Sequence, residues 1–103
     1  MYAARAFQRG EIIETCPVIV CRAWEAQGTF RDYWWEWKPR GRYGLPLGYV
    51  SMMNHGGRRR RNVLVTRLYG RRVMQLRAAR AISVGEELLL DYGMPSYDFV
   101  VLD

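Results

Sequence analysis

The stretch that most constrains the fold lies near the end of the chain, at residues 85–93, and reads GEELLLDYG. Leu88, Leu90 and Tyr92 are two positions apart, so in an extended strand their side chains point to one face. Gly93 follows, and glycine readily adopts the positive φ of a turn. The pattern predicts a strand ending in a tyrosine whose ring packs on the core. The hydroxyl group at the core's edge fits either a structural residue or a reacting group.

Other segments also have the composition of strands, and no segment shows a long helical period. Residues 11–21 are rich in β-branched side chains. Pro17 has no N–H to donate, which predicts a sheet edge or a bulge at that point. Residues 63–69 and 72–78 flank a short glycine-containing turn and predict a β-hairpin. The predicted fold class is therefore mainly β.

Aromatic side chains alternate along another predicted strand. Tyr33, Trp35 and Trp37 share one parity, so they predict a strand with one wholly aromatic face. That face fits a core strand or, alternatively, a wall beside a bound cation. Residues 38–44 have the composition of a loop. The apolar and aromatic tail at residues 94–103 is expected to dock back on the body of the domain.

Length and cysteine content limit the classes of protein to consider. The 103 residues suit one domain spanning residues 1–103. With a single histidine in the chain, Cys16 and Cys21 cannot complete a four-ligand zinc site, so no metal is predicted. In a strand they point to opposite faces, which predicts reduced thiols. The absence of a long apolar run or a signal-peptide core predicts a soluble intracellular protein with no membrane contact.

The charge balance is basic, with a formal net charge of +6, and Lys38 is the only lysine. Arginine favours forked contacts with carboxylate or phosphate groups. The run of four arginines is predicted to form an exposed loop, which fits a solvated surface or contact with nucleic acid or an acidic partner. Its members are Arg58, Arg59, Arg60 and Arg61.

Two separate segments carry a family resemblance. Residues 45–56 read LPLGYVSMMNHG, and residues 77–93 read RAARAISVGEELLLDYG. In this order and at this spacing they resemble the SET domain family of protein lysine methyltransferases. Residues 9–20, RGEIIETCPVIV, are similar to the family's early strands. Many relatives carry a zinc-binding cysteine cluster after the tyrosine motif, which this chain lacks, so it resembles the compact type of bacteria and viruses.

The resemblance implies a fold and an activity. The fold is a SET-like β-clip of several small sheets, with a knot-like crossing near the C-terminus that brings Asn54 beside Tyr92. The activity is transfer of a methyl group from S-adenosylmethionine to a lysine side chain of a protein, a histone being one candidate. Relatives of the compact type also form dimers, so a homodimer stays open.

The resemblance also implies roles for individual residues. Tyr92 takes the place of the catalytic tyrosine, and Leu90 stands where many relatives carry Phe or Tyr. Because leucine is smaller, we expect a roomy lysine channel and di- or trimethylated products. The remaining implied roles are cofactor contact through Asn54, His55, Tyr97 and Phe99, and lining of the lysine channel by Tyr49 beside Leu90. Tyr97 and Phe99 also fit simple core positions.

Two departures from the family pattern leave other functions open. The GxG strand that binds the cofactor in relatives has no counterpart, because residues 1–3 stand where that strand should finish. Asn62 takes the place of the asparagine that follows the Asn-His pair, after a longer gap. The alternatives are a catalytically weakened SET-like protein-binding module and a small arginine-rich nucleic-acid-binding protein.

Overall fold

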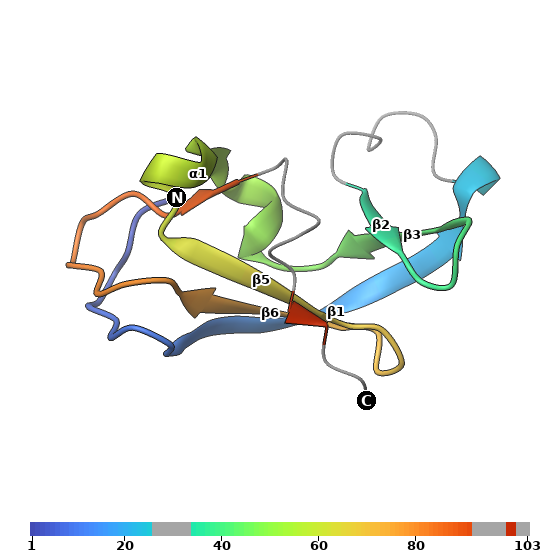
Figure 1. The fold of residues 1–103 in the computed structure, drawn as a ribbon, viewed down its shortest axis with the longest axis horizontal. Helices are drawn as coiled ribbons and strands as arrows, with labels where there is room; N and C mark the ends of the chain where they lie inside the picture. The colour runs from blue at the N-terminus through green and yellow to red at the C-terminus, as the bar shows by residue number, and fades with distance from the viewer. Residues whose placement is uncertain (26–33, 92–98, 101–103) are drawn as a thin grey trace.

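The computed structural model describes residues 1–25, 34–91 and 99–100 of the chain (Figure 1). Strands dominate, and the helices are single turns. The strands are β1 (Ile12–Arg22), β2 (Trp35–Trp37), β3 (Arg42–Pro46), β4 (Asn54–His55), β5 (Val63–Leu68), β6 (Val73–Ala78), β7 (Leu89–Leu90) and β8 (Phe99–Val100). The helical turns are η1 (Ala23–Glu25), η3 (Tyr49–Met52) and α1 (Gly57–Arg60).

Among the described residues, six strands form one sheet in the order β2-β3-β1-β6-β5-β8, and β4 pairs with β7. The long strand β1 joins the two halves of the larger sheet. Its residues 12–17 pair with β6, and its residues 18–22 pair with β3. Pro17 therefore lies where β1 changes partner, a position at which the missing N–H costs least. The irregularity in the β1 ladder lies between Ile12 and Glu14 rather than at Pro17.

The predicted hairpin is confirmed, with β5 and β6 antiparallel from the pair Val63–Ala78 to the pair Leu68–Val73. Alternate residues of β6 are buried, and Met74 and Leu76 have no exposed surface. β8 lies parallel to the other edge of β5, with Phe99 beside Thr66 in the backbone register. The described part of the tail thus docks on the sheet as predicted.

The loop predicted at residues 38–44 is wrong in its second half, because Arg42–Pro46 form strand β3. Gly44 explains why this strand fits beside β2. A Cβ atom at Gly44 would lie 2.6 Å from Cγ1 of Val18 and 2.9 Å from the ring of Trp37. The glycine thus lets the strand approach the indole closely. In this segment a glycine, which is typical of turns, is needed for close packing between strands.

The aromatic strand at β2 packs mainly inward. Trp37 is 3% exposed and its ring meets that of Tyr69 edge to face, with centroids 5.0 Å apart. The Arg67 guanidinium lies 5.0 Å from the centroid of the Trp35 ring. The cation beside this wall is therefore one of the chain's own arginines. Tyr33, the third aromatic residue of the predicted face, lies outside the described residues.

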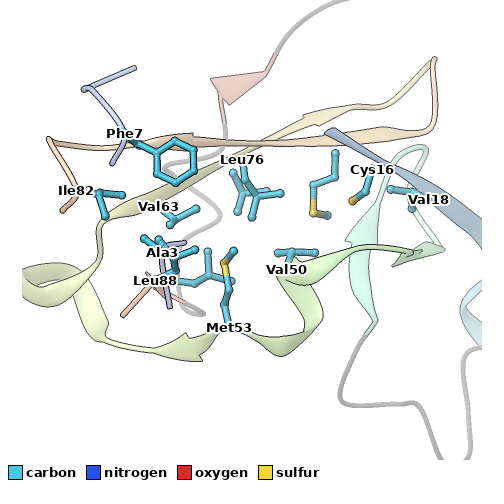
Figure 2. Close-up of a cluster of buried hydrophobic side chains, with 14 of the residues drawn as sticks. Ala3, Phe7, Cys16, Val18, Val50, Met53, Val63, Leu76, Ile82 and Leu88 are labelled. Atoms are coloured by element: carbon cyan, nitrogen blue, oxygen red, sulfur yellow. The ribbon is translucent and has the colours of Figure 1, made fainter. Parts of the chain in front are cut away.

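The core lies between the sheet and the segments that carry β4, η3 and β7 (Figure 2). Leu90 and Val63 in this cluster are 0% exposed, and burying one such side chain stabilises the fold by about 1.5–3 kcal/mol. Figure 2 labels ten of the buried side chains: Ala3, Phe7, Cys16, Val18, Val50, Met53, Val63, Leu76, Ile82 and Leu88. Segments from both ends of the sequence thus share one core.

The two cysteines are free thiols in different settings. Burial, and then the nearby Glu14 carboxylate, raises the pKa of the Cys16 thiol to about 11. The pKa of Cys21 is also raised, by burial and by the charge of Glu25. Neither thiol is set up for nucleophilic chemistry, which needs a lowered pKa.

Candidate functional site

The two sequence motifs meet at the parallel pair β4–β7. In its register Asn54 aligns with Leu89 and His55 with Leu90. The backbone N–H of Gly56 donates to the carbonyl of Leu90 at 2.7 Å. A Cβ atom on Gly56 would lie only 2.8 Å from Cβ of Leu89, so this close approach requires glycine. The Asn-His-Gly segment and the segment before Tyr92 therefore lie side by side.

Carboxylates flank the amide and imidazole side chains of β4, both of which are exposed. Nδ2 of Asn54 donates to Oε2 of Glu87 at 2.9 Å. Nδ1 of His55 lies 4.0 Å from Oδ1 of Asp91, at the outer limit of an ion pair with a protonated imidazole. The site thus combines an amide and an imidazole with carboxylates, whose negative charge attracts a cationic ligand.

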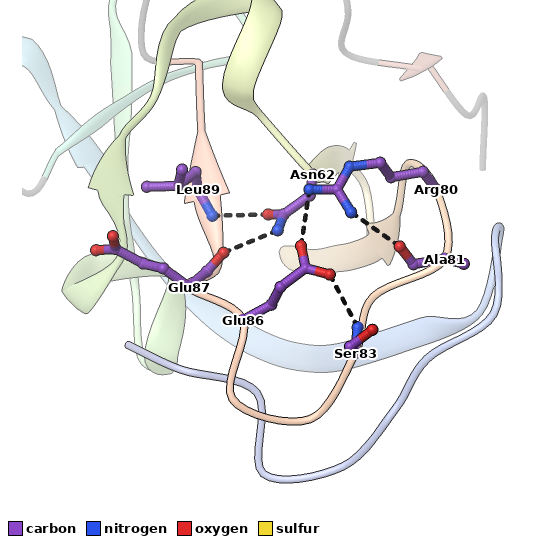
Figure 3. A network of polar contacts seen from close by, with 7 residues as sticks. All are labelled: Asn62, Arg80, Ala81, Ser83, Glu86, Glu87 and Leu89. Atoms are coloured by element: carbon purple, nitrogen blue, oxygen red, sulfur yellow. Dashed lines mark hydrogen bonds and ion pairs between the residues drawn. The ribbon is translucent and has the colours of Figure 1, made fainter.

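The buried residue Asn62 supports this site by hydrogen bonds to the backbone of Glu87 and Leu89 (Figure 3). Oδ1 of Asn62 accepts from the N–H of Leu89 at 2.8 Å, and Nδ2 donates to the carbonyl of Glu87 at 2.8 Å. The backbone N–H of Asn62 donates to the carbonyl of Leu89 at 3.1 Å, and the carbonyl of Asn62 accepts from the N–H of Ala79 at 2.8 Å. Asn62 is only 1% exposed. The family resemblance pointed to Asn62 as a residue of the motif. The structure shows what Asn62 does, which is to hold β7 next to the start of β5.

The N-terminal segment supports the same stretch on another side. The N–H of Leu88 donates to the carbonyl of Met1 at 2.9 Å, and that of Ala3 donates to Glu86 at 2.8 Å. Tyr2 and Glu87 form an antiparallel bridge. Residues 86–88 are therefore held by backbone bonds from the chain start as well as by Asn62.

The arginine run forms a helical turn and not the predicted loop. The N–H of Arg61 donates to the carbonyl of Gly57 at 3.0 Å, which closes the turn of α1. The predicted exposure is confirmed for Arg58, Arg59 and Arg60. In Figure 1, α1 lies next to the pair of segments that carries the site. Contact of these side chains with nucleic acid stays a prediction.

Glu86 closes the turn that leads into the site (Figure 3). Its Oε2 lies 2.7 Å from Nη2 of Arg80, and its Oε1 accepts from the N–H of Ser83 at 3.0 Å. These bonds, that to Arg80 first, lower the pKa of the Glu86 carboxyl from 4.5 to about 2. The ionised carboxylate therefore stabilises the turn more than the protonated group does.

We expect Glu86→Gln to flatten the dependence of stability on pH in acid. Because folding lowers the pKa of Glu86, its contribution is fully present above pH 4.5 and is lost as the pH falls toward about 2. Urea unfolding at about pH 6 and about pH 3 measures the loss in each protein. The variant should lose less stability than the unchanged protein, and an equal loss would contradict the assignment.

The remaining predicted site residues fall in different places. Tyr49 is 60% exposed on η3, and its backbone N–H donates to the Glu14 carboxylate at 2.9 Å and 3.1 Å. Leu90 is the second residue of β7, and its side chain is fully buried in the core. Tyr92 and Tyr97 lie outside the described residues, and Phe99 is described only as part of β8.

Within the described parts of the chain, no group of three or more His, Cys, Asp or Glu is placed to hold a metal ion. No helix there is long and apolar enough to cross a membrane.

Comparison with known proteins bears on family and fold. The family model described as SET domain matches residues 1–93. A Plasmodium falciparum protein described as a candidate histone methyltransferase superposes with a TM-score of 0.72 at 26% identity, covering 90% of this chain and 86% of that one. For CpSET8 from Cryptosporidium the TM-score is 0.66 at 18% identity, with coverage of 93% and 51%. No curated protein matches the chain. The predicted mainly β, SET-like fold is confirmed, and the knot-like crossing stays a prediction.

Proposed function

The chain belongs to the SET domain family, and we propose that it transfers a methyl group from S-adenosylmethionine to the side-chain amine of a lysine in a protein. One observation carries the proposal: the β4–β7 pairing sets Asn54 and His55 beside the segment that leads into Tyr92. The likeness to a candidate histone methyltransferase also supports methyl transfer and makes histones the first substrates to test.

The chemistry of the side chains fits S-adenosylmethionine. Its amino-acid end carries an ammonium and a carboxylate, and its adenine presents donors and acceptors. Asn54 donates to Glu87 and keeps its carbonyl oxygen as an acceptor, and His55 presents an exposed imidazole. We assign Asn54 to the amino-acid end and His55 to the adenine. Tyr97 and Phe99 are proposed to cover the adenine, with a core role as the alternative.

The target amine must lose its charge before it can react. A free lysine has a pKa near 10.4, so neutralising it at pH 7 costs about 4–5 kcal/mol. An apolar channel lowers that pKa by desolvation. We propose that the ring of Tyr49 flanks the lysine stem and that the hydroxyl of Tyr92 orients the nitrogen without adding charge. When bound, S-adenosylmethionine supplies an electrophilic methyl group on its sulfonium.

A labelled-methyl assay tests the proposal. The protein is incubated with methyl-labelled S-adenosylmethionine and either core histones or a cell lysate, and mass spectrometry locates the label. Label on lysine is the expected result. The alternative of a weakened SET-like binding module is separated by calorimetry, because that module should give no binding heat with S-adenosylmethionine. A folded protein that neither binds the cofactor nor transfers the label would overturn the proposal.

The size of Leu90 leads to a prediction about the product. Leucine has less bulk than Phe or Tyr and no hydroxyl group to hold a water, so the proposed channel has room for an amine that already carries a methyl group. We expect di- or trimethyllysine when the enzyme is in excess, and Leu90→Tyr should shift the product toward monomethyllysine. Mass spectrometry of a methylated peptide measures both. Monomethyllysine alone from the unchanged protein would count against this role of Leu90.

A further inference from the structure

We infer that Glu87 is a positioning residue that fixes the orientation of the Asn54 side-chain amide, an inference that rests on the proposed function of this site. Nδ2 of Asn54 lies 2.9 Å from Oε2 of Glu87. An ionised carboxylate can only accept hydrogen bonds, so it must face the NH₂ group of the amide. The carbonyl oxygen Oδ1 of Asn54 is thereby turned away from Glu87 and kept as an acceptor.

Hydrogen bonds hold the backbone of Glu87, so the position of its Cα atom is well defined. The carbonyl of Glu87 accepts from Nδ2 of Asn62 at 2.8 Å. The same residue bridges to Tyr2, and the next N–H, that of Leu88, is bonded to Met1 at 2.9 Å. Glu87 is partly buried, whereas Asn54 is exposed. A glutamate with a fixed backbone and a partly buried side chain thus restrains the amide of an exposed asparagine.

The neighbouring glutamate provides a natural comparison. Figure 3 shows the carboxylate of Glu86 directed to Arg80 and Ser83, while that of Glu87 extends to the other side of the chain. The two residues have the same chemistry and adjacent positions, but only Glu87 contacts a residue assigned to the ligand. Exchanging each for glutamine therefore separates an effect on the site from a general effect of removing one negative charge nearby.

The orientation of the amide decides which ligand group the site accepts. With Oδ1 presented, Asn54 accepts from a cationic amino group, and the charge of Glu87 adds attraction for the same group. Glutamine at position 87 can donate as well as accept, so it permits either orientation of the Asn54 amide and contributes no charge. The inferred ligand group is the ammonium of an amino-acid moiety.

The experiment compares Glu87→Gln and Glu86→Gln by calorimetry with two probes. S-Adenosylmethionine carries the amino-acid end, and 5′-methylthioadenosine lacks it. We expect Glu87→Gln to weaken binding of S-adenosylmethionine about tenfold, as loss of a charge-assisted contact implies. Binding of 5′-methylthioadenosine should not change. Glu86→Gln should leave both affinities as they are, and Glu87→Asp should retain more affinity than Glu87→Gln.

A second measurement is independent of the ligand. Side-chain amide signals of Asn54 in NMR should show slowed hydrogen exchange in the unchanged protein and in Glu86→Gln, and faster exchange in Glu87→Gln. Thermal unfolding of each variant checks that it is folded. Unchanged affinity in Glu87→Gln, or equal weakening for both probes, overturns the inference. If the unchanged protein binds neither probe, the proposed function falls, and this inference falls with it.

Discussion

Replacing Tyr92 with phenylalanine should lower the rate of methyl transfer by about a hundredfold, the loss typical of a misplaced or missing catalytic group. The change removes one oxygen atom and keeps the aromatic ring. The amine would still enter an apolar channel, but it would lose the hydroxyl group that orients its lone pair. Binding of S-adenosylmethionine, assigned to Asn54 and His55, should be unaffected. Initial rates with labelled cofactor, together with calorimetry, measure the two effects separately.

Tyr43→Phe is the matched control for this experiment. Tyr43 is half-buried in β3, which pairs with β1 and β2 and does not contribute to the β4–β7 pair. The control makes the same chemical change and should leave the rate as it is. Equal rates for Tyr92→Phe and the unchanged protein would remove Tyr92 from the mechanism. Loss of cofactor binding in Tyr92→Phe would show instead that the tyrosine shapes the cofactor site.

The sequence predicted strands where local pattern and burial agree. In β6 the alternation of Met74, Leu76 and Ala78 matches a ladder with one buried face, and the register follows from it. The pattern misled at residues 38–44, where Gly44 is needed for close packing on an indole from another strand. It also misled at the arginine run, because one helical turn is too short to show a period. The first error concerns packing between strands, and the second concerns an element of four residues.

The meeting of the two motifs could be expected only from the family resemblance, since their parallel pairing joins segments that are separated in the sequence by the whole β5–β6 hairpin. The hydrogen bonds that support the two motifs could not be predicted from a sequence pattern. Asn62 satisfies backbone groups of Glu87 and Leu89, and such a need exists only once β7 is buried. The different roles of Glu86 and Glu87 likewise depend on which side of the chain each side chain takes.

Asn62→Ala should destabilise the fold by about 2–4 kcal/mol, because it leaves a buried N–H and a partly buried carbonyl without their side-chain partner. These are the N–H of Leu89 and the carbonyl of Glu87, each bonded to the Asn62 side chain at 2.8 Å. For a domain of this size, that loss corresponds to a fall in the unfolding temperature on the order of 10–20 °C. Urea and thermal unfolding at neutral pH measure it.

Asn54→Ala makes the same chemical change on the exposed side of the site and separates stability from binding. The Asn54 amide is hydrogen-bonded to the Glu87 carboxylate in a solvent-exposed setting. Its loss should change the free energy of unfolding by less than about 0.5 kcal/mol, while calorimetry should show weaker binding of S-adenosylmethionine. If Asn62→Ala unfolded at the same urea concentration as Asn54→Ala, the hydrogen bonds of the Asn62 side chain would not be what holds β7 in place. The proposed site would then need another support, because both of its motifs depend on the position of that strand.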